Sequence, residues 1–551
     1  MSRFLHDSGI ALPLTLAKYR DWNPFIAQTH CPGLAQQAVL RDILLQQAGT
    51  AFGQAHRFGS LHTYEEFAGE VPVSTYEDLR PAIEAQEKSG KPLLTSAHPI
   101  LYTQTSGTTG VPKHIPILTQ TVDAIRRYQR LFAYAQWQGV PAIYQGSVLV
   151  ISGQSIEGHL PGGTPFGSMS GLMFNCLPAV IRRKCLLRDG ESAASDYRQR
   201  YLNIAVRALA DPSISVLATP NPSTILKLLE VMRSEYALLL EMLSGETRGG
   251  CPPLPERVPI SSTRLSQLRA FIGQEEALDC ATLWPNLQAV VTWMGGNCAV
   301  LIPRLRSLLP QRARIIEMGY LSSECLGTLN VDVLNNRCVP TLADNLFEFV
   351  EVGDEASDVK PILLHQLQAG RKYTVIVTTR NGLYRYAMHD IIEVTGYFSR
   401  TPTIRFIQKG KGVTNITGEK LYEHQVTEAV GQALNARGLS SEFFVMLADV
   451  ENSRYTLCVE QVSSLGDLGI LVEERLASMN IEFKAKRASR RLQPIRVLRL
   501  RCGTGDVYRR HCVSNGQREA QFKLIRLQYS HECTFDFERH GEVMALCVCV
   551  A

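Results

Sequence analysis

The stretch Tyr102-Thr-Gln-Thr-Ser-Gly-Thr-Thr-Gly-Val-Pro-Lys-His114 is the part of this 551-residue chain that decides most about its fold. Its glycines let the backbone turn tightly and bring several N–H groups close to an anion. Hydroxyl groups and a lysine add further donors for a phosphate. The candidate phosphate-binding residues are Ser106, Gly107, Thr108, Thr109, Gly110 and Lys113.

The spacing of this loop differs from that of a P-loop, because the lysine lies outside the second glycine. Nucleotide phosphate binding is the functional interpretation of this loop. The alternative is a polar hairpin loop, since runs of Ser, Thr and Gly often form ordinary loops.

The bulk composition indicates a globular chain of two or more domains. Hydrophobic residues make up 45% and charged residues 20%, which is ordinary for such a chain. A net charge of +5 without a basic arm predicts no nucleic-acid partner. The 14 cysteines form no CxxC pair and no zinc-finger spacing, so we expect reduced thiols rather than a zinc site.

The apolar N-terminal run Ile10–Ala17 is short, is interrupted by Pro13, and is followed by charged residues rather than a cleavage site. No run approaches the roughly 20 apolar residues that a membrane span needs. We therefore expect no membrane association and a cytoplasmic location. A monomer is the expected oligomeric state.

Strands and helices alternate on both sides of the glycine loop. A strand over 99–103 leads into it, a second strand covers 115–118, and a helix runs from Thr119 or Thr121 to about residue 138. Residues 158–171 are predicted to form a long loop. Further strands are predicted at 147–151, 215–220, 290–294 and 314–317. Repeated strand–loop–helix units predict an α/β domain whose ligand lies at the strand ends.

The pattern changes after about residue 400. Lys409-Gly-Lys-Gly412 is a flexible, basic joint, and beyond it strands at 443–446 and 455–459 alternate with helices at 421–435 and 468–478. This pattern is typical of a smaller α+β domain. We therefore predict an N-terminal domain over 1–408, a hinge over 409–412 and a C-terminal lid domain over 413–551.

Two short segments carry candidate groups after predicted strands. In Gly319-Tyr-Leu-Ser-Ser-Glu324, Tyr320 could stack on a purine, the hydroxyls of Ser322 and Ser323 could bind the nucleotide, and Glu324 could hold Mg²⁺. A helix N-terminus capped by a serine is an equally good interpretation. The glycine turn at Gly295 and Gly296 supplies Gly296 as a further cofactor-binding candidate.

Three other candidates lie nearer the C-terminus. Leu383-Tyr-Arg-Tyr-Ala-Met-His-Asp390 is predicted to be a strand with an aspartate at its end, where Asp390 could bind ribose hydroxyls or be an ordinary turn residue. Lys420 follows the joint, and Lys523 lies in Gln521-Phe-Lys-Leu-Ile-Arg526. Either lysine could simply be a solvated surface cation.

Together these segments resemble the adenylate-forming superfamily, and specifically the Gretchen Hagen family of acyl-acid-amido synthetases in its bacterial form. Tyr320-Leu-Ser-Ser-Glu324 is similar to the family's Tyr-Ala-Ser-Ser-Glu motif, and Leu383–Asp390 to its Tyr-Arg-Tyr-Arg-Val-Gly-Asp motif. Asn415 with Glu419 and Lys420 matches the next segment, and Gln521–Arg526 a terminal Gln-Tyr-Lys-x-Pro-Arg signature. The matches follow one another in order from about residue 100 to 526.

The chain also departs from the family pattern. His389 stands where the family usually has glycine, and Ala387 where plant members often have arginine. Lys409 replaces an arginine at the domain joint, which keeps the charge but loses the bidentate fork. Ile525 replaces a proline.

The resemblance implies a large N-terminal adenylate-forming domain with a smaller, mobile C-terminal domain, and a two-step reaction that uses ATP and Mg²⁺. A small carboxylic acid would form an acyl-adenylate and pyrophosphate, and an amine, commonly an amino acid, would then form the amide and release AMP. Lys420, Lys523 and Glu324 would be catalytic, with Glu324 as the metal ligand. Lys409 would bind the nucleotide at the joint.

Other reaction classes stay open. The adenylate could be transferred to coenzyme A or to a carrier-protein thiol, or the chain could be an inactive nucleotide-binding regulator. Trp293, Met294 and the 158–175 segment are candidates for the acyl pocket, but they do not identify the acid.

Overall fold

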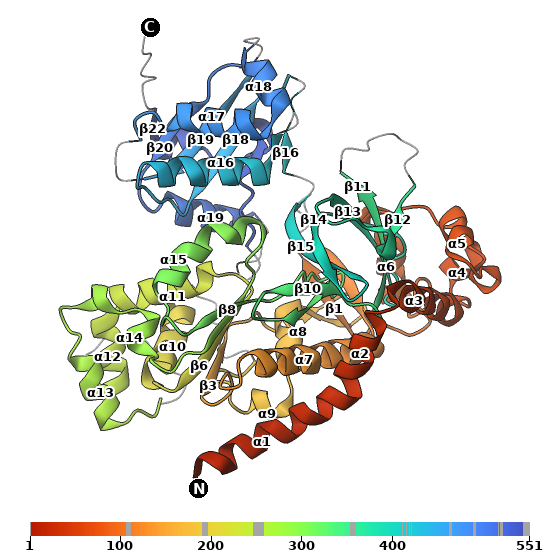
Figure 1. The fold of residues 1–551 in the computed structure, drawn as a ribbon, viewed down its shortest axis with the longest axis horizontal. Helices are drawn as coiled ribbons and strands as arrows, with labels where there is room; N and C mark the ends of the chain where they lie inside the picture. Colours follow the sequence, from red (N-terminus) through yellow and green to blue (C-terminus); the bar gives the residue numbers. More distant parts are fainter. Residues whose placement is uncertain are drawn as a thin grey trace.

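The computed structural model describes residues 2–105, 112–189, 197–245, 258–352, 360–409, 412–414, 416–417, 419, 421–461, 465–488, 492–515, 517, 519 and 522–543. Figure 1 shows a large body of two lobes, with a smaller C-terminal unit packed against one side of it. The predicted α/β class with a large N-terminal and a smaller C-terminal part is confirmed. None of the described helices is long and apolar enough to cross a membrane.

One lobe is built on a sheet of four parallel strands in the order β3-β6-β7-β8. Its central strands are almost wholly buried, as expected for a parallel sheet covered on both faces. The strands are β3 (Ser147–Val150), β6 (Ile214–Ala218), β7 (Ala289–Thr292) and β8 (Arg314–Glu317). Because they run in one direction, the loops that follow β6, β7 and β8 meet at one edge of the sheet.

Helices cover both faces of this sheet (Figure 1). Their buried side chains form two hydrophobic cores, one on each face, that share the sheet between them. The helices are α7 (Thr119–Gly139), α8 (Met169–Asn175), α9 (Ala179–Arg182), α10 (Tyr197–Ala210), α11 (Ser223–Ser234), α12 (Tyr236–Ser244), α13 (Ser262–Arg269), α14 (Cys280–Leu283) and α15 (Ile302–Ser307). The N-terminal helix α1 (Ser2–Ala17) packs on α7 and α9.

The second lobe contains an antiparallel sheet in the order β12-β11-β13-β14-β15. Its core is closed by α3 (Pro32–Gln47) and α6 (Tyr76–Ser89). Helix α6 has a clear start and stop, because Asp78 accepts the N–H of Thr75 and Gly90 ends it at φ +67°. The strands are β11 (Asn345–Glu351), β12 (Ile362–Leu363), β13 (Lys372–Thr379), β14 (Tyr386–Phe398) and β15 (Thr401–Lys409).

Two smaller sheets join the lobes. The first has the order β2-β1-β5-β4, and the second is the hairpin of β9 and β10. Their strands are β1 (Leu101–Thr105), β2 (Lys113–Ile117), β4 (Gly158–His159), β5 (Pro165–Gly167), β9 (Thr328–Asp332) and β10 (Arg337–Pro340).

The C-terminal unit has its own mixed sheet in the order β21-β18-β19-β20-β22 and its own core. The strands are β18 (Phe444–Asp449), β19 (Arg454–Glu460), β20 (Arg496–Leu500), β21 (Leu527–Tyr529) and β22 (Gly541–Val543). The helices are α16 (Glu423–Ala436), α17 (Leu468–Met479), α18 (Ile481–Ala488) and α19 (Thr504–Ser514). The short ladder of β16 (Val413–Thr414) and β17 (Leu421–Tyr422) leads into this unit.

Two sequence-based expectations about local structure are wrong. Residues 158–171 are not a plain loop, since β4 and β5 lie within them and β5 pairs with β1. Gly167 lets the backbone of Ser155 pass close to β5, since an added Cβ would lie 1.9 Å from the Ser155 carbonyl oxygen. Helix α7 starts after Leu118 rather than at a threonine N-cap, although the Thr121 hydroxyl accepts the Leu118 N–H at 3.3 Å.

Candidate functional site

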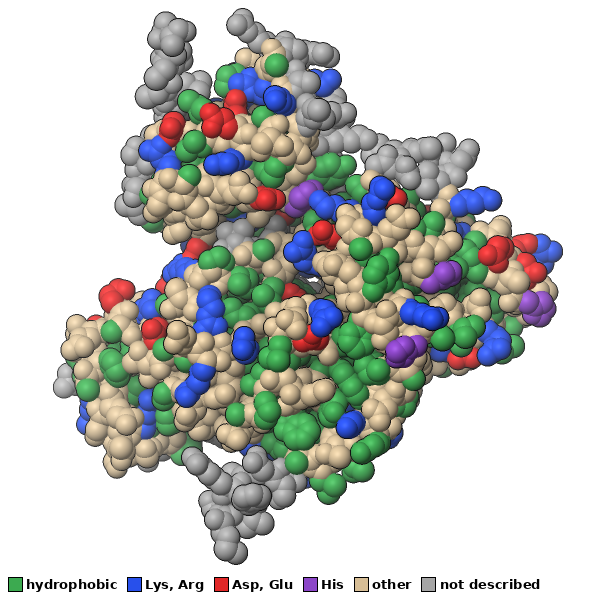
Figure 2. All heavy atoms as spheres, viewed as in Figure 1, with side chains coloured by type: hydrophobic (Ala, Val, Ile, Leu, Met, Phe, Trp, Pro, Cys, Tyr) green, Lys and Arg blue, Asp and Glu red, His purple; other side chains and the backbone are tan. Residues whose placement is uncertain are grey.

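A cleft of about 1970 Å³ lies where the two lobes and the C-terminal unit meet. Its walls come from the loops after β6, β7 and β8, from the β14–β15 edge of the antiparallel sheet, and from the segment before β21. In Figure 2 the surface is hollowed at this junction, with Lys and Arg side chains beside the hollow. A crevice at the carboxyl ends of parallel strands is the usual ligand site of such sheets.

The glycine loop joins β1 to β2, which pair as a hairpin from Thr105 opposite Lys113. Residues 106–110 lie outside the described residues, so the phosphate-binding prediction for them stays a prediction. Lys113 itself lines the cleft. Its amine donates to the Tyr386 hydroxyl at 3.3 Å and lies 5.4 Å from the centre of the Tyr76 ring.

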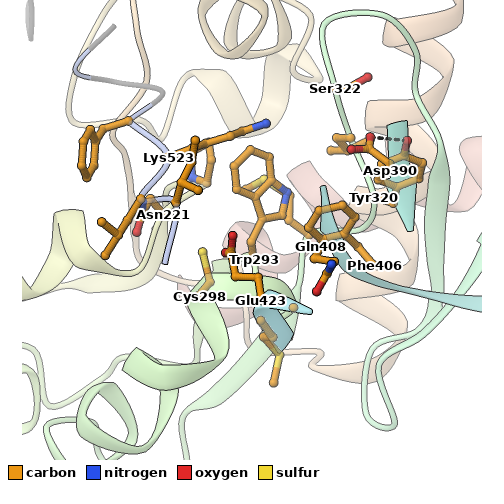
Figure 3. Close-up of a pocket in the computed structure, with 18 of the residues that line it drawn as sticks. Asn221, Trp293, Cys298, Tyr320, Ser322, Asp390, Phe406, Gln408, Glu423 and Lys523 are labelled. Carbon is orange, nitrogen blue, oxygen red and sulfur yellow. Dashed lines mark hydrogen bonds between the residues drawn. The ribbon is translucent and has the colours of Figure 1, made fainter. Parts of the chain in front are cut away.

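Tyr320 and Asp390 form a buried pair at one wall of the cleft (Figure 3). The Tyr320 hydroxyl donates to the Asp390 carboxylate at 2.6 Å, and burial with the nearby carboxylate raises the pKa of Tyr320. The Tyr320 ring lies parallel to Phe406, with centroids 5.8 Å apart. Gly327 fits beneath the ring, since an added Cβ would lie 2.4 Å from its Cδ1. The tyrosine is therefore held rigidly.

Asp390 was expected at the end of a strand, and this is wrong: it lies inside the long strand β14. The register shows why it still reaches the cleft. Thr374 of β13 pairs with Ile391, but Ile376 pairs with Ala387, so β14 carries extra residues at 388–390. Such a bulge redirects side chains and is common beside active sites.

His389 takes the strained position of this bulge. Its φ is +51°, in the left-handed region that glycine adopts most easily. The side chain is exposed and lines the cleft. The backbone of His389 thus has the conformation that glycine adopts most easily, which agrees with the glycine expected at this place.

The other residues of the Leu383–Asp390 motif mainly support the sheet. Arg385 is buried against the carboxylate of Glu348 at 2.8 Å, and the Tyr384 hydroxyl donates to the Leu94 carbonyl. Tyr386 faces the cleft beside Lys113. Side chains of this motif therefore either stabilise the interior of the lobe or line the cleft.

Residues 321–326 form a tight turn rather than a helix start, so the helix alternative for this segment is wrong. Leu321 and Leu326 bridge antiparallel, and the Ser322 hydroxyl accepts the Cys325 N–H at 3.1 Å. The turn brings Ser322, Ser323 and Glu324 to the cleft. Glu324 lines the same cleft as the Lys113–Tyr386 pair, and burial and then the charge of Glu324 raise the pKa of Tyr386.

The glycine turn after β7 packs against β15. Gly296 has φ +57°, and an added Cβ would lie 2.9 Å from Phe406 Cε1, while one on Gly295 would lie 2.7 Å from the Phe406 carbonyl oxygen. Gly295 lines the cleft, and Gly296 lets Phe406 approach. Gly296 was predicted to bind the cofactor directly; its described contacts are with β15.

The joint and its lysines are described only in part. Lys420 and residues 410–411 lie outside the described residues, and of Lys409 only the backbone, paired opposite Asp390, is described. Beyond the joint, Gly412 accepts the N–H of Glu423 at 2.7 Å. The carboxylate of Glu419 accepts N–H groups of Ile416 and Thr417 and the Tyr455 hydroxyl, so it fixes the loop before Lys420 to β19.

Lys523 lines the cleft from the C-terminal unit, and in Figure 3 its amine points toward the middle of the cleft. Arg526 anchors the same segment: its side chain is 2% exposed, lies 4.1 Å above the Phe444 ring, and donates to the carbonyls of Phe444 and Glu442. Burial lowers the pKa of Arg526 to about 10, so it remains a cation at neutral pH.

The site also contains residues that the sequence analysis did not single out. Phe406 and Gln408 of β15, Cys298, Glu317 and Glu423 all line the cleft. Phe406 carries no sequence signal, because an aromatic in an alternating strand is ordinary. Glu317 had one: it is a carboxylate at the end of a strand that precedes a glycine turn.

The described residues hold no cluster of three or more His, Cys, Asp or Glu side chains suited to a metal ion. Mg²⁺ commonly needs only one or two carboxylates, because substrate phosphates and water complete its shell. The position of Glu324 at the cleft therefore fits a metal that is shared with a nucleotide.

Profiles of a single family match most of the chain. The GH3 family N-terminal domain matches residues 22–313, the central domain 339–409 and the C-terminal domain 424–532. The chain belongs to the GH3 family. The first match covers β3, β6 and β7 of the parallel sheet with most of the N-terminal helices, the second covers the antiparallel sheet, and the third covers most of the C-terminal unit.

Curated relatives agree with this assignment. The chain is 24% identical over 554 residues to indole-3-acetic acid-amido synthetase GH3.15 of Arabidopsis thaliana, covering 89% of each chain. It is 25% identical over 547 residues to a probable indole-3-acetic acid-amido synthetase, GH3.2, of Oryza sativa subsp. japonica, covering 89% of this chain and 87% of the relative.

Solved structures share the fold. GH3.15 acyl acid amido synthetase superimposes with a TM-score of 0.82 at 21% identity, covering 94% of this chain and 95% of that one. A 2-hydroxyisobutyryl-CoA ligase in its postadenylation state has a TM-score of 0.55 at 13% identity, covering 90% and 89%. The GH3 chain thus has the architecture of adenylate-forming enzymes.

Proposed function

We propose that this GH3 protein is an ATP-dependent ligase that adenylates a small carboxylic acid and transfers the acyl group to an amine, in most cases an amino acid. The observation that carries the proposal is the convergence of Lys113, Tyr320, Glu324, Asp390 and Lys523 on one cleft. These residues are far apart in sequence, and each lies in a segment that resembles a motif of the same family.

The first step concentrates negative charge around one phosphorus, so positioning and electrostatic stabilisation carry most of its catalysis. The glycine loop with Lys113 holds the phosphates, and Asp390 binds ribose hydroxyls. Tyr320 would lie against the adenine, and Ser322 and Ser323 would lie beside the nucleotide. Glu324 would hold Mg²⁺, and the metal would neutralise charge at the phosphates.

The second step needs a cation near the acyl carbonyl or the α-phosphate. Lys420 is proposed to lie at the α-phosphate or the acyl oxygen. Lys523 is proposed to enter during only one of the two half-reactions, through movement of the C-terminal unit. The placement of Lys523 in the cleft, on a segment anchored by Arg526, supports its part of this assignment.

The acyl end of the cleft favours an acid with a flat, apolar body. Trp293 lies in the cleft and is partly exposed, and Met169, Met173 and Met294 also line the cleft. Polarisable sulfur atoms and an indole face pack well against aromatic groups. The names of the relatives, which refer to indole-3-acetic acid, agree with such an acid.

One assay separates the reaction classes. Pyrophosphate release is measured with ATP, Mg²⁺ and a panel of carboxylic acids, with an amino acid, with coenzyme A, or with neither. We expect release only with an acid, and an amide only with the amino acid. A thioester product would favour the coenzyme A alternative, and acid-independent ATP hydrolysis or no nucleotide binding would refute the proposal. The monomeric state and cytoplasmic location stay predictions.

A further inference from the structure

Glu317 occupies a special place at the end of β8. Its carboxylate lines the cleft, and each of its oxygens accepts a backbone N–H from a different loop. The N–H of Met294 donates to Oε2 at 2.7 Å, and that of Gly319 to Oε1 at 2.9 Å.

The two loops carry different parts of the site. Met294 follows Trp293, on the loop after β7 that forms the apolar wall. Gly319 precedes Tyr320, on the loop after β8 that holds the Asp390 pair. Gly319 itself has φ +98°, and an added Cβ would lie 2.8 Å from the Thr328 carbonyl oxygen, so this backbone has little room to move.

The backbone of Glu317 is fixed as well. Its N–H donates to the Asn336 side chain at 2.8 Å, and its carbonyl accepts from Asn330 at 3.0 Å. The two asparagines also bond each other at 3.1 Å. The carboxylate is thus attached to a rigid hairpin and reaches from it to both loops.

We propose that Glu317 is a positioning residue. It holds the loop around Trp293, which forms the acyl wall, in a fixed position relative to the loop around Tyr320, which forms the nucleotide wall. The inference rests on the proposed function, since it assumes that acid and nucleotide meet between these walls. No Lys or Arg among the described residues forms an ion pair with Glu317, so the connection runs through backbone amides alone.

The ionised form of Glu317 is the one that can do this. A carboxylate accepts at both oxygens, whereas a protonated carboxyl presents one O–H donor toward a backbone N–H. Burial raises the pKa of Glu317, opposed by the hydrogen bonds from Gly319 and Met294. The titratable groups that face it are Cys298, Cys338 of β10 and Tyr128 of α7, all with pKa values raised chiefly by burial.

The variant Glu317→Gln tests the proposal, because glutamine keeps the shape but offers one acceptor and one donor. We expect amide hydrogen exchange at Met294 or Gly319 to become at least about tenfold faster. We also expect the KM values for both acid and ATP to rise by about tenfold in pyrophosphate release, with a smaller change in kcat. Protonation of Glu317 should make wild-type activity fall on the acidic side of the pH profile, and this fall should disappear in the variant, which has no carboxyl group to protonate.

Glu351→Gln is the matched control, since Glu351 lies on β11 and pairs with Arg371 at 2.7 Å. It should leave the exchange, the KM values and the pH profile unchanged. If Glu317→Gln does not fold, Glu317→Asp keeps the charge but is one methylene too short to reach both loops, and the same exchange difference is expected.

If Glu317→Gln exchanges the amides of Met294 and Gly319 at the wild-type rate and keeps the wild-type KM values, the proposal is overturned. The proposed function would then remain intact. Failure of the wild-type protein to release pyrophosphate with any acid would overturn the function, and with it the kinetic part of the inference. The exchange experiment then still decides whether Glu317 joins the two loops.

Discussion

At the scale of single residues, the site depends on side chains that reach the cleft because the backbone at their positions has an unusual conformation. Asp390 is the clearest case, because a bulge of β14 turns a mid-strand residue toward the nucleotide wall. The residue is 1% exposed, and its carboxylate accepts the hydrogen bond of the Tyr320 hydroxyl. One residue therefore serves both the fold and the proposed ribose contact.

These two roles of Asp390 can be separated by substitution. Asp390→Ala leaves the buried Tyr320 hydroxyl without its acceptor, which should cost about 1–3 kcal/mol of unfolding free energy. Asp390→Asn keeps an acceptor oxygen and should be nearly as stable as the wild type. Both should weaken ATP binding by about tenfold or more, measured by calorimetry. Normal ATP affinity in both variants would remove Asp390 from the ribose site.

His389 offers a test of the strain in the same bulge. A residue other than glycine in the left-handed region costs about 1–2 kcal/mol, and part of this is returned as entropy when glycine is introduced. His389→Gly should therefore stabilise the protein by up to about 1 kcal/mol in chemical denaturation. His389→Ala removes the same imidazole but keeps the strain, so it should not stabilise. Equal effects of the two substitutions would show that the backbone is not strained there.

At the scale of elements, the close approach of the β7 turn to β15 sets the position of Phe406, and through it the Tyr320 ring. Gly296→Ala should push Phe406 away, because its Cβ would lie 2.9 Å from Cε1 at φ +57°. We expect a loss of about 2–4 kcal/mol and weaker nucleotide binding.

Gly370→Ala is the matched control for Gly296→Ala. Gly370 has φ +80°, and an added Cβ would meet no atom within 4 Å, so only the backbone cost of about 1–2 kcal/mol remains. ATP affinity should stay normal in this variant. If the two alanines weaken stability and ATP binding alike, the contact with Phe406 has no part in the site.

The element scale also shows what the sequence could predict. Apolar strands that end in glycine turns indicated the parallel sheet and the edge where ligands bind, because burial and turn chemistry are local properties. The bulge at 388–390 could not be predicted from this chain's own residues, since histidine, unlike the glycine that the family usually has there, gives no sign of a left-handed backbone. The strand pairing within 158–171 was missed for a similar reason. A glycine such as Gly167 usually indicates a loop, and the sequence does not show that a neighbouring backbone passes close to it.

Motif residues were placed more reliably than their contacts. Tyr320, Glu324 and Lys523 were expected at a nucleotide site, and all line one cleft. That Tyr320 bonds Asp390, or that Glu317 joins two loops, depends on pairings across 70 and 23 residues that no local pattern contains. The predicted domain boundaries at 408 and 413 stay predictions.

At the scale of the whole molecule, His424 links the C-terminal unit to the antiparallel sheet. Its ring lies between Lys372 of β13 and Gln408 of β15, with the Lys372 amine 3.1 Å from Nε2 and Nδ1 donating to Gln408 at 3.0 Å. Burial and then the Lys372 charge lower its pKa to about 4, from 6.5.

Acid should therefore loosen this link. Between pH 6.5 and about 4 the unfolded chain binds a proton at His424 and the folded chain does not, so the stability contributed above pH 6.5 is lost as the pH falls toward 4. His424→Gln, which cannot be protonated, should flatten this part of the curve of melting temperature against pH. The exposed His531, changed to Gln, should leave the curve as in the wild type, and a wild-type curve for His424→Gln would contradict the assignment.

The proposed movement of the C-terminal unit can be tested through Lys523. Lys523→Ala should reduce one half-reaction at least about tenfold more than the other, as for loss of one charged contact that is made in only one conformation. Pyrophosphate exchange reports the first half-reaction, and amide formation from a supplied acyl-adenylate reports the second. Lys484→Ala, on α18 away from the cleft, is the control. Equal losses in both assays would mean that Lys523 is a fixed contact.

The distribution of thiols makes such movement directly observable with fluorescent labels. Burial raises the pKa of the thiols of Cys176, Cys185, Cys280, Cys298, Cys338, Cys458, Cys512 and Cys533, which slows their alkylation. Among the described cysteines, Cys31 before α3 and Cys502 before α19 are exposed. Cys31 lies in the N-terminal body and Cys502 in the C-terminal unit, the two parts that would move relative to each other. When Cys251, Cys547 and Cys549 are changed to serine, a donor and an acceptor dye can be attached to the two remaining reactive thiols. Energy transfer between the dyes would then report the distance between the two parts of the chain in each half-reaction.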